Sequence, residues 1–144
     1  MTHADFSIGA VAKAAQTSPE TVRHYEKIGL IPPPPRSNGR RVYGAAHRDR
    51  LIFIRHARAL GFGLEAIRTL LDLADHPGRD CAEADQIASQ QLADVQSKIA
   101  RLSALQTELE RMVTQCRHGT SAECRVIAVL SDHDLCLAHD HDTP

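Results

Sequence analysis

Apolar residues recur at helical spacing near the start of the chain and predict a helix over residues 6–16. A second helix is predicted over 19–28, because Ser18 suits the N-cap position and Pro19 the first helical position. Gly29 then ends this helix. Two short helices joined by a tight turn are typical of a helix-turn-helix.

The next segment combines a stiff connector with a hairpin. Residues 32–35 are four prolines, which favour an extended chain. Asn38 and Gly39 are a strong signal for a two-residue hairpin turn. Arginines flank this turn on both sides, so the sequence predicts a small, positively charged wing over 36–43.

The remaining pattern is also helical. It predicts helices over 45–60, 64–75, about 80–116 and 125–130, with a loop over 117–124 and a polar tail over 137–144. His76, Pro77 and Gly78 break the chain before the long helix, and Asp80 with Glu83 resembles a capping-box start.

The long helix carries a seam in which steps of three and four residues alternate, as in the core positions of a coiled coil. Its members are Leu92, Val95, Ile99, Leu102, Gln106, Leu109, Val113 and Cys116. Gln106 either fixes the register of paired helices or lies near solvent. We therefore expect a mainly α fold: a winged helix-turn-helix over 1–75, a linker and dimerisation helix over 76–116, and a metal-binding loop, short helix and tail over 117–144.

Charge is distributed unevenly along the 144 residues, although the net charge is only −1. Residues 1–60 hold ten Lys or Arg against four Asp or Glu, whereas the remainder holds seven against fourteen. A basic first part predicts contact with a polyanion. With 3% aromatic residues and no evident nucleophile–base arrangement, an enzyme is not expected. No leader segment or long apolar run is present, so we expect a cytoplasmic protein that does not contact a membrane.

Double-stranded promoter DNA is the expected polyanion. A winged helix-turn-helix places its second helix in the major groove and its wing along the phosphate backbone. Arginine and tyrosine side chains at such positions usually hydrogen-bond phosphates. The candidate contacts are Thr21, Arg23, His24, Tyr25 and Lys27 on the helix, and Arg36, Asn38, Arg40, Arg41 and Tyr43 on the wing.

Cysteines at the two ends of the long helix indicate a shared metal site. Cys81 and Cys116 would lie about 50 Å apart within one chain, too far to bind one ion. If two copies of the helix pair antiparallel, Cys81 lies beside the partner's Cys116, which Cys124 follows closely in sequence. The spacing thus predicts a three-thiolate site that forms only across a dimer interface.

Thiolates suit zinc, cadmium, lead, mercury and copper(I). Three thiolates alone fit mercury or lead, whereas His118 could supply the fourth ligand that zinc prefers. We expect a divalent ion, zinc first, with cadmium, lead and mercury as alternatives. A second cluster, Cys136, His139 and His141, either forms an auxiliary site or binds metal only weakly.

Two motifs carry a family resemblance: VRHYEKIGLI at 22–31 and RSNGRRVY at 36–43. They resemble the DNA-binding domain of the MerR family of transcriptional regulators, and the likeness extends over residues 6–130. The loop from Cys116 to Cys124, with Cys81 ahead of the helix, is similar to the metal-sensing branch. The resemblance implies a homodimer held by an antiparallel coiled coil. It also implies that the metal-bound protein distorts a promoter with overlong element spacing, so that RNA polymerase can use it.

The resemblance also assigns individual residues. Arg23 and Tyr25 fall at recognition-helix contacts and Arg41 and Tyr43 at wing contacts, while Arg40 stands where the family usually has an aromatic residue.

The resemblance bears on the metal as well. Copper and silver sensors of the family typically have Ser at the position of Cys81, so Cys81 favours the divalent group. Two alternatives remain open on the same scaffold. One is a copper or silver sensor that uses only Cys116 and Cys124, and the other is a thiol-based redox or electrophile sensor.

Overall fold

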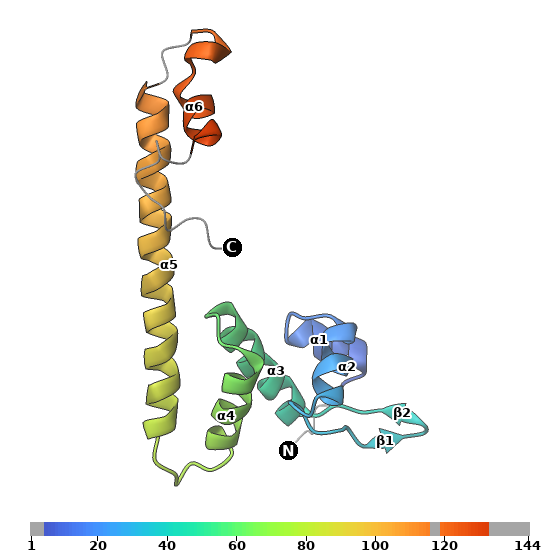
Figure 1. Cartoon of the computed structure of the whole chain (residues 1–144). Helices are drawn as coiled ribbons and strands as arrows, with labels where there is room; N and C mark the ends of the chain where they lie inside the picture. Colours follow the sequence, from blue (N-terminus) through green and yellow to red (C-terminus); the bar gives the residue numbers. More distant parts are fainter. Residues whose placement is uncertain (1–4, 116–118, 133–144) are drawn as a thin grey trace. The chain divides into compact units, whose positions relative to one another are not determined.

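The computed structural model describes residues 5–115 and 119–132 of the chain (Figure 1). In chain order the elements are α1 (Ile8–Ala14), α2 (Pro19–Lys27), β1 (Arg36–Ser37), β2 (Arg40–Arg41), α3 (Ala45–Ala59), α4 (Leu64–Ala74), α5 (Ala82–Gln115), the short 3-10 helix η1 (Ser121–Glu123) and α6 (Arg125–Ser131). The mainly α fold is confirmed, and the helix ends lie within two residues of the expected ones. Across these described residues, no helix has the length and apolar character needed to span a membrane.

Local capping explains where the first two helices begin. The Ser7 hydroxyl accepts a hydrogen bond from the Ala10 N–H at 3.1 Å and so caps α1. The Ser18 hydroxyl accepts from the Thr21 N–H at 3.1 Å and caps α2. At the other end of α2, Gly29 has a φ of 79°, a left-handed conformation that glycine adopts without a steric penalty.

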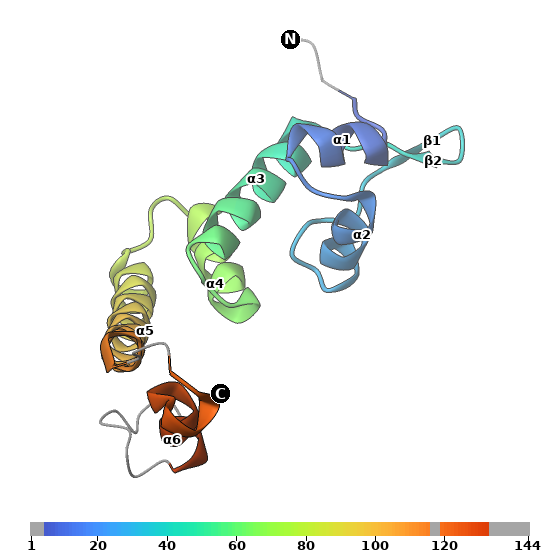
Figure 2. The ribbon, with the colours of Figure 1, turned by 90° about the horizontal axis from the view of Figure 1, so that it is seen from above.

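The four N-terminal helices enclose one apolar core, in which α1 contacts α2 and α3, and α3 contacts α4 (Figures 1 and 2). Its largest fully buried side chains are Tyr43, Leu30, Ile31, Leu51, Ile54, Ile67, Val11 and Val22. They come from all four helices and from the segments around the hairpin. This core therefore fixes the orientation of α2, the predicted recognition helix.

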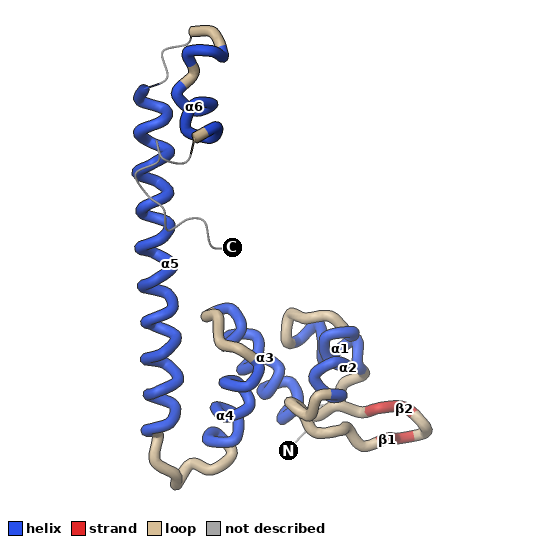
Figure 3. Tube along the Cα trace, viewed as in Figure 1, coloured by secondary structure: helices blue, strands red, loops and turns tan. Residues whose placement is uncertain are grey.

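The hairpin has short strands and projects from this core (Figure 3). Arg36 pairs with Arg41 and Ser37 with Arg40, and the turn between them has positive φ at Asn38 and Gly39. This is the turn that the Asn-Gly pair predicts. The base of the hairpin is held by two backbone hydrogen bonds of 2.7 and 2.8 Å between Phe6 and Tyr43.

The long helix α5 contains 34 residues, which corresponds to about 50 Å. Asp80 Oδ1 accepts a hydrogen bond from the Ala82 N–H at 2.9 Å at its start. Cys81 lies at the N-cap of α5, because its carbonyl accepts the first helical hydrogen bond, from the Asp85 N–H at 3.0 Å.

The chain divides into two compact units, residues 1–88 and 89–144. The boundary falls inside α5, whereas the sequence suggested divisions after residues 75 and 116. In the second unit, Met112 of α5 and Val129 of α6 are buried against each other, with Val126 beside them. This small cluster holds α6 against the C-terminal part of α5.

Candidate DNA interface and metal site

The recognition helix α2 presents its basic side chains to solvent. Three predicted helix contacts are exposed: Arg23, His24 and Lys27. Thr21 and Tyr25 are half-buried. The Thr21 hydroxyl lies 2.8 Å from the Ser18 hydroxyl, so it also takes part in the N-cap. Tyr25 packs partly against the core. The three exposed residues are therefore the predicted helix contacts that are most open to a nucleic acid.

The wing adds further positive charge. Arg36, Asn38 and Arg40 are exposed, and Arg36 Nη1 donates to the Gly39 carbonyl at 3.3 Å across the turn. Arg41 is less exposed, and its Nη1 lies 3.3 Å from Glu26 Oε2. Glu26 belongs to α2, so this ion pair joins the wing to the recognition helix.

Tyr43 differs from its predicted role. Its side chain is 0% exposed, and its hydroxyl donates a hydrogen bond to Glu26 Oε2 at 3.1 Å. Burial, and then the hydrogen bond to Glu26, raise the pKa of Tyr43. The predicted contact of Tyr43 with a phosphate is therefore wrong for this conformation, because the backbone bridge to Phe6 directs the tyrosine into the core. Tyr43 instead supports the base of the wing through its contacts with Phe6 and Glu26.

Glu26 was missed by the sequence reasoning, although a signal was present. The first 60 residues contain only four acidic side chains, and Glu26 is one of them, on a helix expected to approach a polyanion. Glu20 suits the first turn of this helix, whereas an acid near the other end indicates an internal partner. In the structure one carboxylate oxygen of Glu26 accepts from both Arg41 and Tyr43.

Helix α2 and the wing together line a shallow basic hollow of about 470 Å³. Its lining residues are Ser7, Ile8, Arg23, Arg36, Gly39, Arg40 and Arg41. Four guanidinium groups thus border one surface depression. This arrangement suits a phosphate group, because arginine donates paired hydrogen bonds to phosphate oxygens and its charge is permanent.

Two further arginines hold the C-terminal end of α2. Arg68 Nη2 of α4 donates to the Ile28 carbonyl at 2.6 Å, and Arg50 Nε of α3 donates to the Leu30 carbonyl at 2.7 Å. Cations are favourable at a helix C-terminus, where carbonyls lack helical partners. These two side chains connect the end of the recognition helix to α3 and α4.

Two candidate metal ligands lie within the described residues. Cys81 is exposed, Cys124 is half-buried, and both are free thiols. Each is the residue directly before a helix, α5 for Cys81 and α6 for Cys124. The other predicted ligands lie outside the described residues: Cys116, His118, Cys136, His139 and His141. Over residues 5–115 and 119–132, no three His, Cys, Asp or Glu side chains converge on one point.

The predicted seam of α5 is open to solvent in the single chain. Its exposed fractions are 57% for Leu92, 37% for Val95, 57% for Ile99, 62% for Leu102, 59% for Leu109 and 71% for Val113. Gln106 is exposed in the same stripe and lines a shallow groove with Leu102, Leu105 and Leu109. An apolar stripe of this length on one helix is a typical protein-interaction surface.

Family models match most of the described chain. The model "MerR HTH family regulatory protein" matches residues 6–74, and "MerR, DNA binding" matches residues 48–112. Together they cover the winged helix-turn-helix and most of α5.

Individual relatives agree with this match. The chain is 37% identical to the HTH-type transcriptional regulator ZntR of Escherichia coli (strain K12), over 87% of this chain and 92% of the relative. It is 40% identical to the mercuric resistance operon regulatory protein of Serratia marcescens, over 88% of each chain. The crystal structure of the transcription regulator PbrR691 from Ralstonia metallidurans CH34 in complex with lead(II) is similar with a TM-score of 0.75 and 39% identity, over 87% of this chain and 98% of that one.

These relatives are transcriptional regulators rather than enzymes, and they match this chain over nearly their whole length. The basic hollow, the recognition helix and most of the long helix lie within the matched residues. The chain belongs to the MerR family of helix-turn-helix transcriptional regulators, within its metal-sensing branch.

Proposed function

We propose that this protein is a homodimeric activator in the cytoplasm that binds promoter DNA and responds to a thiophilic divalent metal ion at its dimer interface. The observation that carries the proposal is the apolar seam of α5, which is exposed in the single chain and ends near candidate thiolate ligands. The proposal joins three parts: a dimer, a DNA surface and a shared metal site.

The dimer is supported by the seam itself. Six large apolar side chains on α5 are between 37% and 71% exposed, and they follow the spacing of coiled-coil core positions. Burying them against a second copy of α5 would remove this area from water. An antiparallel pairing places Cys81, at the start of α5, beside the loop that follows the end of the partner's α5.

The DNA surface is supported by the basic hollow. Arg23 on α2 and Arg36, Arg40 and Arg41 on the wing would bind phosphates, and His24 on the exposed face of α2 would approach the major groove. Asn38 at the wing tip is exposed and would contact the backbone. Tyr43 is left out of the contact set because it is buried.

The metal site would combine Cys81 of one protomer with Cys116 and Cys124 of the other. The donor chemistry fits a soft divalent ion, because Cys81 and Cys124 are free thiols that solvent can reach. His118 would complete the four ligands that zinc prefers. Three thiolates alone would suit lead or mercury, the ions in the names of two relatives.

Activation would work through DNA shape. Dimer geometry sets the separation of the two recognition helices, so a small rotation between subunits changes the twist and bend of the DNA between them. A metal ion that binds one rotated state more tightly would shift the population toward it. RNA polymerase would then engage promoter elements that are otherwise misaligned.

The test is induction from the native promoter with a panel of zinc, cadmium, lead, mercury, cobalt, copper and silver salts. Wild type and Cys81→Ser are compared side by side. We expect a response to divalent ions that the substitution abolishes. A copper or silver response that survives in Cys81→Ser would instead assign sensing to Cys116 and Cys124. Activation of metal-free protein by peroxide or an aldehyde would favour the thiol-based sensor.

A further inference from the structure

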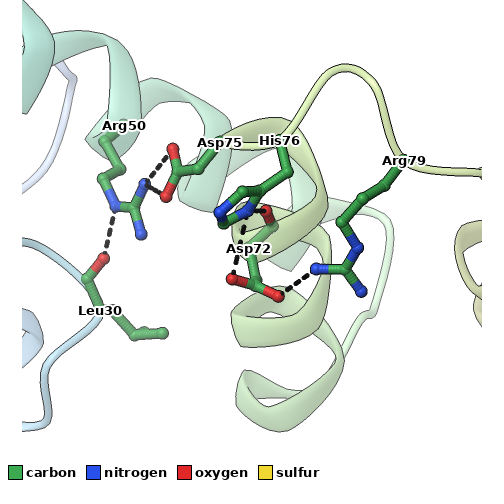
Figure 4. Close-up of polar contacts among 6 residues, drawn as sticks. All are labelled: Leu30, Arg50, Asp72, Asp75, His76 and Arg79. Atoms are coloured by element: carbon green, nitrogen blue, oxygen red, sulfur yellow. Dashed lines mark hydrogen bonds and ion pairs between the residues drawn. The ribbon is translucent and has the colours of Figure 1, made fainter.

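The linker between α4 and α5 is bordered by two groups of polar contacts (Figure 4). In the first group, Arg50 of α3 connects two distant backbone segments. Its Nη1 donates to both carboxylate oxygens of Asp75 at 3.0 Å, and its Nε donates to the Leu30 carbonyl at 2.7 Å. Asp75 is the residue that ends α4. One guanidinium therefore joins the start of the linker to the segment that follows the recognition helix.

The second group centres on Asp72, which lies one helical turn before Asp75 on α4. Arg79 of the linker donates from Nη1 to Asp72 Oδ2 at 2.7 Å, and its Nη2 lies 3.8 Å from Glu83 Oε2 in the first turn of α5. His76 Nδ1 lies 2.7 Å from the Asp72 carbonyl. The Arg79 N–H also donates to the His76 carbonyl at 3.0 Å. The linker is thus folded into a turn that is fastened to α4 and to the start of α5.

These contacts form a continuous path within residues 1–88. It runs from Leu30, whose N–H donates to the Tyr25 carbonyl of α2 at 2.9 Å, through Arg50 to Asp75, then along one turn of backbone to Asp72, and through Arg79 to Glu83. Cys81 lies between Arg79 and Glu83 in sequence. A displacement of the segment that carries Cys81 is therefore opposed by contacts that lead to the segment directly after the recognition helix.

Stability alone does not explain this arrangement. Three of the four ion-pair partners are about half open to water, with side chains 47% exposed for Arg79, 57% for Asp72 and 53% for Asp75, whereas Arg50 is 24% exposed. Exposed ion pairs contribute little net folding free energy. Their clearer effect is geometric, because a guanidinium with several acceptors holds them at fixed separations.

We infer that Arg50 and Arg79 are positioning residues that couple Cys81 to the recognition helix. The inference rests on the proposed function, in which Cys81 binds metal. A metal ion that draws Cys81 toward the partner protomer displaces the linker. The Arg79–Asp72 and Arg50–Asp75 contacts then pass this displacement to the segment that follows α2. Without these two ion pairs the linker would move independently of α4, and metal binding would no longer reorient the recognition helix.

The experiment compares four variants with the wild-type dimer: Arg79→Ala, Asp75→Asn, the charge exchange Asp72→Arg with Arg79→Asp, and the control Asp94→Asn. Asp94 is an exposed α5 carboxylate that accepts from Gln90 within the same helix, away from the linker. For each protein we would measure transcription with and without Zn²⁺ or Pb²⁺. Ion affinity is measured by competition with a chelator, metal-free affinity for promoter DNA by fluorescence anisotropy, and folding by circular dichroism.

We expect the ratio of induced to uninduced transcription to fall about fivefold in Arg79→Ala and in Asp75→Asn, within the range by which single residues change coupling. Ion affinity and metal-free DNA affinity should stay within about twofold of wild type, as should all properties of Asp94→Asn. The charge exchange should restore at least half of the lost ratio. A purely structural role would instead change folding and metal-free DNA affinity.

Three results would overturn the inference. The first is full induction in Arg79→Ala, and the second is no recovery in the charge exchange. The third is a loss of induction that is fully explained by weaker ion binding, since that would place Arg79 in the metal site itself. A wild-type protein that responds to none of the ions would remove the proposed function, whereas a responding wild type with an unaffected Arg79→Ala would remove only the coupling.

Discussion

Shortening one seam side chain should weaken the dimer by an amount that the exposed area allows us to estimate. Leu102 is 62% exposed in the single chain. Complete burial of a leucine side chain is worth about 1.5 to 3 kcal/mol, so burying this exposed part against a partner is worth about 1 to 2 kcal/mol. Alanine at the same position retains only a small part of that area. Leu102→Ala should therefore lose about 1 kcal/mol per chain.

Each dimer contains the substitution twice, so the total loss is about 2 kcal/mol. This corresponds to a Kd that rises about 30-fold. Dissociation is followed by dilution of a dimer labelled with a donor and an acceptor fluorophore, and sedimentation equilibrium provides an independent measurement. The matched control is Leu60→Ala, because Leu60 is 67% exposed but lies after α3, outside the seam.

The outcome separates three possibilities. If Leu102→Ala weakens the dimer and Leu60→Ala does not, the seam is the interface. If both substitutions leave the Kd unchanged, the exposed stripe on α5 is not what joins two copies. If only Leu60→Ala weakens the dimer, the interface lies on the N-terminal unit, and the antiparallel arrangement that brings Cys81 to the partner's thiols loses its basis.

Three further predictions concern the support of the DNA surface and the linker. Tyr43→Phe removes a buried hydrogen bond to Glu26 and should lower the free energy of unfolding, measured in urea, by about 1 kcal/mol. An unchanged unfolding midpoint would contradict this prediction. Gly29→Ala places a side chain at a φ of 79° and should lower the free energy of unfolding by about 1 to 2 kcal/mol. The same urea titration measures this change, and equal or greater stability would refute the capping argument. The Arg79 guanidinium lowers the pKa of the Asp72 carboxyl, so Asp72 should contribute stability above about pH 4 that is lost as the pH falls through its folded-state pKa. Melting curves of wild type and Asp72→Asn between pH 7 and pH 3 should therefore converge at the acid end, and a constant difference would argue against the ion pair.

The sequence predicted the features that depend on neighbouring residues. Ser18 and Pro19 defined the start of α2, and the Asn38–Gly39 pair defined the hairpin turn, because caps and tight turns are governed by a few adjacent side chains. The seam of α5 was also visible, because its period is a property of one continuous helix. These features were sufficient to predict the mainly α fold and the basic surface.

The role of Tyr43 was not predicted correctly, because it is decided by a contact from a distant part of the chain. Tyr43 follows a run of arginines and was grouped with them as a DNA contact. A backbone bridge to Phe6, near the start of the chain, instead fixes this strand so that the ring enters the core. The sequence around Tyr43 contains no local signal for that pairing.

The contacts of Arg50 and Arg68 depend in the same way on tertiary structure. Arg50 bonds residues 20 and 25 positions away, and Arg68 bonds a carbonyl 40 positions away. No period or motif relates such positions before the helices have packed. Composition therefore identified a basic module without separating the arginines that face DNA from those that hold the fold.

The structure separates these two uses of arginine by what each side chain touches. Arg23, Arg36 and Arg40 border an open hollow, so their charge acts on solvent and on any phosphate that enters it. Arg50 instead lies between a carbonyl and a carboxylate, and its charge is compensated within the fold. Asp75 belongs to the acidic part of the chain, so this ion pair joins the basic module to the segment that leads to Cys81. The uneven charge of the sequence thus has a second consequence besides attraction to a polyanion: it provides opposite charges on α3 and at the end of α4, where the linker to α5 begins.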